Sequence, residues 1–155
     1  MGTQMLKTGP RGEAEAGRAT ATTLLVTRRT TFAAAHVLRR SDWSEQRNRQ
    51  VFGACAGEHG HNYSLEVSVS GPLDAATGMV INLKALDSAI RAAVVEHVDH
   101  RHLNRDVLFL DGVIPTAENL AVAFWQQLDA HLGASARLER LRLVESENNS
   151  VEISR

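Results

Sequence analysis

The sequence predicts a single α+β domain, and three observations lead to this expectation. A chain of 155 residues is long enough for one well-buried domain and too short for two ordinary ones. Strand-like alternation comes first, two helical periodicities follow, and two short strand-like segments end the chain, which is an α+β order. Residues 1–21 are small, charged and aperiodic, so we expect a disordered leader there and the domain over residues 22–155.

Composition narrows the class of protein. Apolar residues make up 43% of the chain and charged residues 23%, and no apolar run approaches the ~20 residues that a membrane span needs. The formal net charge of -1 offers no overall attraction to nucleic acid or anionic membranes, so we expect a small-molecule partner. A single cysteine cannot form an internal disulfide, and no secretory signal pattern opens the chain, so the expected compartment is the reducing cytoplasm.

The first half of the chain shows strand-like alternation in two places. One strand is predicted over residues 22–35 and delivers His36 at its end, and a second is predicted over residues 61–70. A further extended piece is expected over residues 79–82. The segment between the first two strands, residues 37–52, is highly charged and has neither a strand nor a helix period, and long ordered excursions of this kind often carry function.

Two amphipathic helices and a hairpin are predicted after these strands. Asn82 is a plausible N-cap for a helix over residues 83–98, whose apolar residues recur at helical spacing. Thr116 is the expected N-cap of a second helix, which ends before Gly133. Residues 138–145 and 151–153 are predicted to be strands around a tight turn that contains two asparagines.

A candidate metal site comes from the pattern of histidines. His59 and His61 are two apart at the start of a strand, so their side chains point to the same face. His36 ends another strand and supplies a third imidazole. Catalytic zinc sites use three protein ligands and leave the fourth position to water or substrate, although with seven histidines in the chain a His-x-His pair can also arise by chance.

Two further constellations can carry chemistry. Cys55 needs a basic partner to lower its pKa, and Asp99-His100 supplies a histidine with a carboxylate to fix its tautomer. The alternative interpretation is a small buried thiol and polar residues that decorate the end of a helix. Glu145 ends a strand with an apolar inner face, so it is either a solvated strand end or an acceptor for the adjacent N–H donors of a pterin or guanine edge.

Taken together, six ordered blocks resemble the 6-pyruvoyltetrahydropterin synthase and 6-carboxytetrahydropterin synthase family. The resemblance spans about residues 24–155, and as a set the six blocks are highly specific. The central block is Cys55-x3-His59-Gly-His61-Asn-Tyr63. The blocks are residues 32–36, 55–63, 77–83, 98–104, 115–119 and 144–146.

The resemblance implies a tunnelling fold, which is a four-stranded antiparallel sheet with two helices on one face. It also implies that protomers form a β-barrel as trimers and pair as a homohexamer, with active sites between subunits. The family's substrate is 7,8-dihydroneopterin triphosphate. The implied site residues are the zinc ligands His36, His59 and His61, the proton-transfer group Cys55, Asp99 and His100, the pterin anchor Glu145, and the substrate contacts Thr116 and Glu118.

The product depends on features that point in opposite directions. The three-residue spacing between Cys55 and His59 resembles bacterial carboxy-forming enzymes of queuosine synthesis. Residues 43–52, 78–82 and 145–149 instead resemble animal-type pyruvoyl enzymes, although Ala117 stands where those have a second threonine. We expect a zinc-dependent lyase that forms 6-carboxy-5,6,7,8-tetrahydropterin. The alternatives are a 6-pyruvoyltetrahydropterin synthase that eliminates triphosphate, and a non-catalytic metal- or pterin-binding oligomer.

Overall fold

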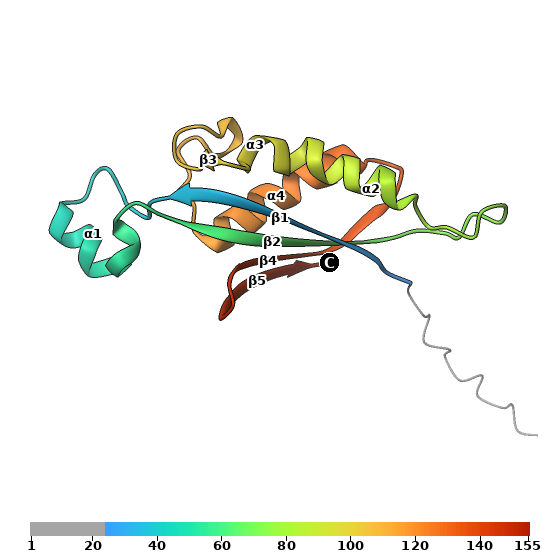
Figure 1. Ribbon diagram of the computed structural model, residues 1–155, viewed down its shortest axis with the longest axis horizontal. Helices are drawn as coiled ribbons and strands as arrows, with labels where there is room; N and C mark the ends of the chain where they lie inside the picture. The colour runs from blue at the N-terminus through green and yellow to red at the C-terminus, as the bar shows by residue number, and fades with distance from the viewer. Residues whose placement is uncertain (1–23) are drawn as a thin grey trace, which may run out of the picture.

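A computed structural model describes residues 24–155 of the chain, and the predicted leader of residues 1–21 lies outside this range. The described part is an α+β domain with a sheet covered by helices on one face (Figure 1). The main strands are β1 (Val26–His36), β2 (His59–Ser70), β4 (Arg137–Ser146) and β5 (Asn149–Ser154). No helix in this range is long and apolar enough to cross a membrane.

The sheet has five strands in the order β3-β1-β2-β4-β5, where β3 is the two-residue strand Arg101–His102. Strands β1, β2, β4 and β5 pair antiparallel, as predicted, but β3 runs parallel to β1 opposite Ala34 and Ala35. The expectation of a purely antiparallel, four-stranded sheet is therefore corrected to a mixed, five-stranded one. A pairing of two residues is too short to leave an alternation pattern in the sequence.

Both predicted helices lie on one face of the sheet. The first comprises α2 (Leu83–Ile90), a π-helical segment at Arg91–Val95 and α3 (Glu96–Val98), and the second is α4 (Ala117–Leu132). The side chain of Asn82 accepts a hydrogen bond from the Lys84 N–H, and that of Thr116 accepts one from Asn119, so both predicted N-caps are confirmed. A short 3-10 turn at Leu108–Leu110 lies between them.

The core lies between the helices and the inner face of the sheet. Every second residue of β2 from Tyr63 onward is fully buried, and these side chains meet Phe32 of β1 and the leucines of β4. The rings of Phe32 and Tyr63 stack with their centroids 4.8 Å apart, and Phe124 of α4 meets Phe32 edge-on. Strand register and core packing therefore depend on the same alternate residues of β2. His59 and His61 precede these residues on the same face of the strand.

Two local expectations are wrong. The charged segment 37–52 contains a helix, α1 (Glu45–Phe52), which is followed by a 3-10 turn at Gly53–Ala56. Asn48 is the buried residue of α1, so this helix has no apolar stripe from which to predict it. Residues 79–82 form no strand, since residues 80–81 are a bend and Asn82 is the N-cap of α2. The Met79 carbonyl accepts a hydrogen bond from the Asp74 N–H at 2.9 Å, which closes the loop before α2.

Two truncations on α4 test this account of the core. Leu128 is fully buried and Val122 is 48% exposed on the same helix. We expect Leu128→Ala to lower the free energy of unfolding by about 2–5 kcal/mol, since it leaves a cavity. Val122→Ala should change it by less than about 0.5 kcal/mol. Urea unfolding followed by circular dichroism measures both, and equal losses would contradict the assigned helix face.

Candidate metal centre and active site

Three histidines meet at one end of the β1–β2 pair. The antiparallel register places His36 opposite His59 and Ala34 opposite His61, so the three imidazoles leave the same face of the sheet. Their ring centroids lie 4.4 to 5.2 Å apart, and one ligand nitrogen of each histidine lies within 4.8 Å of the other two. A single chain therefore brings the predicted metal ligands together.

Backbone carbonyls fix the orientation of two of these rings. The Nδ1 atom of His36 donates to the carbonyl oxygen of Pro115 at 2.8 Å, and Nδ1 of His59 donates to that of Gly57 at 2.9 Å. Because a carbonyl can only accept, Nε2 of each ring carries the lone pair. The Nε2 atom of His59 is buried without a hydrogen-bond partner in the described part of the chain. A carbonyl-held imidazole with its second nitrogen available fits a metal ligand, and with His61 the centre has the three imidazoles that suit zinc.

Burial keeps His36 in the neutral form that a metal ligand requires. Its side chain is 1% exposed, and desolvation lowers its pKa below the usual histidine value. The neighbouring histidines also lower this pKa, whereas the Pro115 carbonyl and the Glu145 carboxylate act in the opposite direction. A neutral imidazole can bind a cation without first losing a proton.

Glu145 and Tyr63 form part of the wall around the histidines. Oε1 of Glu145 lies 3.8 Å from His36 Nε2 and 3.9 Å from His61 Nε2. The Tyr63 hydroxyl lies 3.5 Å from His36 Nε2, and burial raises the pKa of this phenol, so it stays protonated. No role was predicted for Tyr63, although its position two residues after His61 puts its side chain on the same face of the strand.

The three predicted substrate contacts line one cavity of about 460 Å³. Thr116 and Glu118 enter it from the start of α4, and Glu145 enters from the end of β4. Asn148 and Asn149, from the β4–β5 turn that was predicted from its asparagines, lie at the same cavity. Since Glu145 also faces the histidines, the cavity adjoins the candidate metal centre and has the size of a small-molecule site.

Cys55 lies in the 3-10 turn before β2 and is half-buried. Its carbonyl oxygen accepts a hydrogen bond of 2.8 Å from the Leu38 N–H, which ties the turn to the end of β1. A thiolate at Cys55 is close enough to contribute to the raised pKa of Tyr63, although burial is the larger cause. The cysteine therefore lies in the turn that leads directly into the strand of His59 and His61.

Asp99 and His100 lie instead at the outer edge of β1. Oδ1 of Asp99 accepts from the Ala33 N–H and from His100 Nδ1, both at 3.0 Å, and these bonds hold its pKa below the usual range, the Ala33 bond being the larger cause. His100 has a φ of 57°, which is unusual for a residue other than glycine, and its side chain is 82% exposed. Among the described residues, no hydrogen bond or ion pair joins this pair to Cys55.

Comparison with known proteins agrees with this geometry. The family model for 6-pyruvoyl tetrahydropterin synthase matches residues 25–155. The 6-pyruvoyl tetrahydrobiopterin synthase of Drosophila melanogaster is 38% identical over 128 residues, which are 81% of this chain and 76% of the relative. A relative from Archaeoglobus fulgidus, whose proposed name is 6-carboxy-5,6,7,8-tetrahydropterin synthase, is 35% identical over 101 residues, which are 65% of this chain and 79% of its own.

A solved structure supports the same assignment. The 6-pyruvoyl tetrahydropterin synthase of Caenorhabditis elegans superposes with a TM-score of 0.79 at 30% identity, covering 86% of this chain and 96% of that one. The matched region includes every element that carries the histidines and the cavity. The chain therefore belongs to the 6-pyruvoyl tetrahydropterin synthase family of lyases.

Proposed function

We propose that this protein is a zinc-dependent 6-pyruvoyltetrahydropterin synthase that acts on 7,8-dihydroneopterin triphosphate and eliminates triphosphate. One observation carries this proposal: a three-histidine centre opens onto the cavity that holds Glu145, Thr116 and Glu118. The histidine triad is consistent with the zinc site of the family. The cavity adds carboxylates and a hydroxyl that can accept the N–H donors of a pterin ring.

This proposal reverses the product expected from the sequence. The short Cys55 to His59 spacing favoured the carboxy product. The comparisons favour the pyruvoyl product, because the Drosophila pyruvoyl enzyme aligns over 81% of this chain and the carboxy-type relative over 65%. The carboxy product remains our second candidate, since the spacing itself is unchanged. A non-catalytic pterin-binding oligomer is third, and the retention of Cys55, Asp99 and His100 argues against it.

The residues of the chain divide the chemistry among them. His36, His59 and His61 would hold the zinc, which would supply Lewis acidity that makes protons on the substrate side chain easier to remove. Glu145 binds the adjacent N–H donors of the pterin edge and so orients the side chain toward the histidines.

Proton transfer completes the reaction. Cys55 as thiolate takes a proton from the substrate side chain, and His100, oriented by Asp99, exchanges protons with the reacting carbons. The side-chain carbon beside the ring loses its C–H and O–H hydrogens to the ring, so this carbon is oxidised to a ketone as the ring is reduced. The next carbon loses a proton as the C–O bond to triphosphate breaks, and the resulting enol becomes the second ketone.

The separation of Cys55 from Asp99 and His100 supports an active site shared between subunits. Strand β3 covers only Ala34 and Ala35, so most of the outer edge of β1 has no partner strand within residues 24–155, and β5 is the opposite edge of the sheet. Free edges of this kind can pair with another copy of the chain. We place the proton-transfer group at such a contact in a homohexamer built as a dimer of trimers, with each trimer closing a β-barrel.

Metal analysis tests the histidine centre. We expect purified protein to contain about one zinc per chain, because three imidazoles face one point. His59→Ala should lose most of this zinc, whereas Cys55→Ala should keep it and lower kcat by about 10²-fold or more, since it removes a proton-transfer group. Elemental analysis and steady-state kinetics measure the two effects. Equal zinc loss in both variants would mean that Cys55 is itself a ligand.

The identity of the product decides between the two lyase reactions. We expect incubation with 7,8-dihydroneopterin triphosphate to release inorganic triphosphate and yield a pyruvoyl pterin, because the relative with the wider alignment is a pyruvoyl enzyme. Mass spectrometry identifies the pterin, and an aldehyde assay detects acetaldehyde. Acetaldehyde with carboxy-tetrahydropterin would establish the second candidate instead. Binding of substrate without consumption would establish the third.

Mixed oligomers test the shared site. Cys55→Ala and His100→Ala should each be inactive alone, because each removes one half of the proton-transfer group. When the two variants are unfolded and refolded together in equal amounts, we expect about one quarter of wild-type activity. About one quarter of the shared sites then combine an intact Cys55 from one subunit with an intact His100 from its neighbour. The control is each variant refolded alone. Failure of the mixture to regain activity, with a normal oligomer by light scattering, would place all three residues in one subunit.

A further inference from the structure

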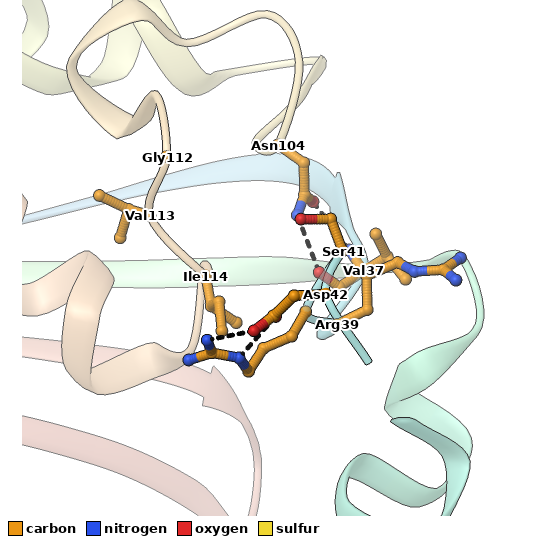
Figure 2. Close-up of a pocket in the computed structure, with 9 residues that line it drawn as sticks. Val37, Arg39, Ser41, Asp42, Asn104, Gly112, Val113 and Ile114 are labelled. Carbon is orange, nitrogen blue, oxygen red and sulfur yellow. Dashed lines mark hydrogen bonds and ion pairs between the residues drawn. The ribbon is translucent and has the colours of Figure 1, made fainter. Parts of the chain in front are cut away.

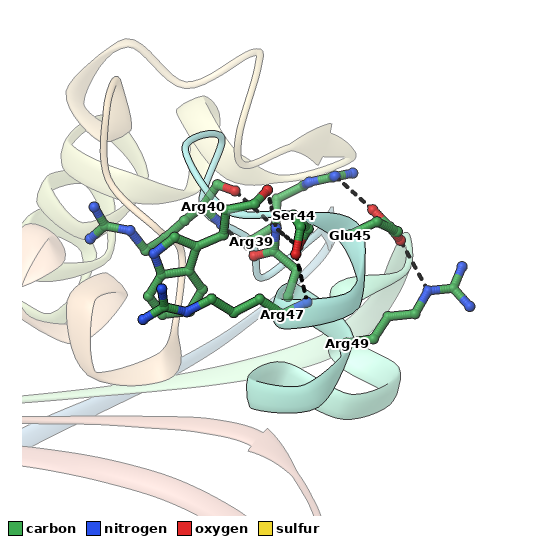
Figure 3. A network of polar contacts seen from close by, with 8 residues as sticks. Arg39, Arg40, Ser44, Glu45, Arg47 and Arg49 are labelled. Carbon is green, nitrogen blue, oxygen red and sulfur yellow. Dashed lines mark hydrogen bonds and ion pairs between the residues drawn. The ribbon is translucent and has the colours of Figure 1, made fainter.

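The segment between β1 and β2 carries an unusual concentration of arginine. From Arg39 to Arg49 there are four arginines against two carboxylates, an excess of two positive charges. Arg39 and Arg49 share Glu45, with N···O distances of 2.9 and 3.0 Å (Figure 3). Arg40 forms two hydrogen bonds to Asp42, of 2.9 and 2.8 Å. Both carboxylates of this segment are therefore paired with arginines, and the segment keeps an excess of positive charge.

Arg47 accounts for part of this excess. Its guanidinium lies over the ring of Trp43 at 4.1 Å from the centroid, and that of Arg40 lies 5.2 Å from the same centroid. No carboxylate within residues 24–155 forms an ion pair with Arg47. Hydrogen bonds from Arg40 hold the pKa of Asp42 below its usual range, and the charge of Arg47 lowers it further. Two guanidiniums thus lie beside one indole ring, and that of Arg40 forms an ion pair with Asp42.

Two asparagines make the backbone under these arginines rigid. The side-chain amide of Asn48, which is fully buried, accepts from the Arg40 N–H at 2.8 Å and donates to the Arg40 carbonyl at 2.9 Å. Asn104 bonds the N–H and the carbonyl of Val37 in the same way, at 2.9 Å each (Figure 2). The arginines therefore project from a backbone that is already ordered, which lowers the entropic cost of binding.

The first part of this segment lines a cavity of about 450 Å³ beside the candidate metal centre. Its lining includes Arg39, Arg40, Asn104 and Ile114, and Figure 2 shows Asn104 and Ile114 in different parts of its wall. Two lining residues connect this cavity to the histidines. Val37 directly follows His36 in the chain, and Ile114 precedes Pro115, whose carbonyl orients the His36 ring. The next residue of the same extended segment, Leu38, lines the cavity that contains Glu145. One strip of backbone thus separates the two cavities.

We propose that Arg40 and Arg47, whose guanidiniums lie 5.2 and 4.1 Å from the centre of the same Trp43 ring, form a subsite for a polyphosphate group. The inference rests on the proposed function, because it assigns the triphosphate of that substrate to these residues. A guanidinium fork matches two phosphate oxygens, and arginine is the side chain best suited to this geometry. The Asp42 side chain is 61% exposed, so water can solvate its carboxylate when an anion takes its place on Arg40.

Binding of inorganic tripolyphosphate to the full-length protein tests the subsite directly. We expect Arg40→Gln to weaken binding by about tenfold or more, because it removes charge-assisted hydrogen bonds. Asp42→Asn should tighten binding by about two- to fivefold, since it releases Arg40 from a competing carboxylate. The matched control is Arg91→Gln, which removes the same charge from an exposed arginine that pairs with Asp87 in the helix layer.

Titration calorimetry on zinc-loaded and metal-free protein measures these affinities, and zinc content is checked after each titration. Binding should persist without metal and should weaken with added salt. The inference is wrong if tripolyphosphate binds only the zinc-loaded protein, or if Arg40→Gln and Arg91→Gln lose affinity equally. It is also wrong if Asp42→Asn weakens binding, because the two arginines would then only hold the loop in place.

Kinetics separates this inference from the proposed function. Arg40→Gln should raise KM for 7,8-dihydroneopterin triphosphate with little change in kcat, and should leave inhibition by unphosphorylated dihydroneopterin unchanged. If the wild-type protein does not consume the substrate but binds tripolyphosphate as described, the proposed function fails and the anion site stands. If the substrate is consumed and Arg40→Gln has the same KM as Arg91→Gln, the subsite fails and the proposed function stands.

Discussion

The register of β1 against β2 is the constraint on which the rest of the structure depends. Eleven residue pairs run from Val26 opposite Val69 to His36 opposite His59. Because side chains alternate along a strand, a slip of one residue would turn one set of histidines to the other face and expose the buried column that begins at Tyr63. The pairing that builds the core is therefore the pairing that assembles the metal centre, and neither can change without the other.

Backbone carbonyls link this centre to elements far away in the chain. Pro115, just before α4, holds the ring of His36, and Gly57, just after the cysteine turn, holds that of His59. The packing of α4 on the sheet thus determines a tautomer at the site. The same approach of α4 brings Thr116 and Glu118 to the cavity that Glu145 enters from β4. Sheet, helix layer and site form one rigid arrangement.

A single chain brings the three histidines and an adjoining cavity together but holds other predicted site residues elsewhere. Asp99 and His100 are held at the edge of β1, where the left-handed backbone of His100 presents an exposed imidazole. The arginines before and within α1 project from a backbone that two asparagine side chains hold in place. Both features fit the proposed function, in which the substrate carries a triphosphate and copies of the chain share the active site.

The sequence by itself determined what depends on local pattern. Strand alternation located β1, β2, β4 and β5, Asn82 and Thr116 marked the starts of helices, and His-x-His gave the metal ligands. Tertiary structure decided what has no local signal. Helix α1 buries a single polar residue and so lacks an apolar stripe, and β3 is two residues long. The hydrogen bond from His36 to Pro115 joins residues 79 positions apart in the chain. The absence of a hydrogen bond or ion pair between Cys55 and His100, among the described residues, likewise depends on the packing of the elements that carry them. Periodicity reports which face of an element is buried, whereas such contacts depend on how whole elements pack.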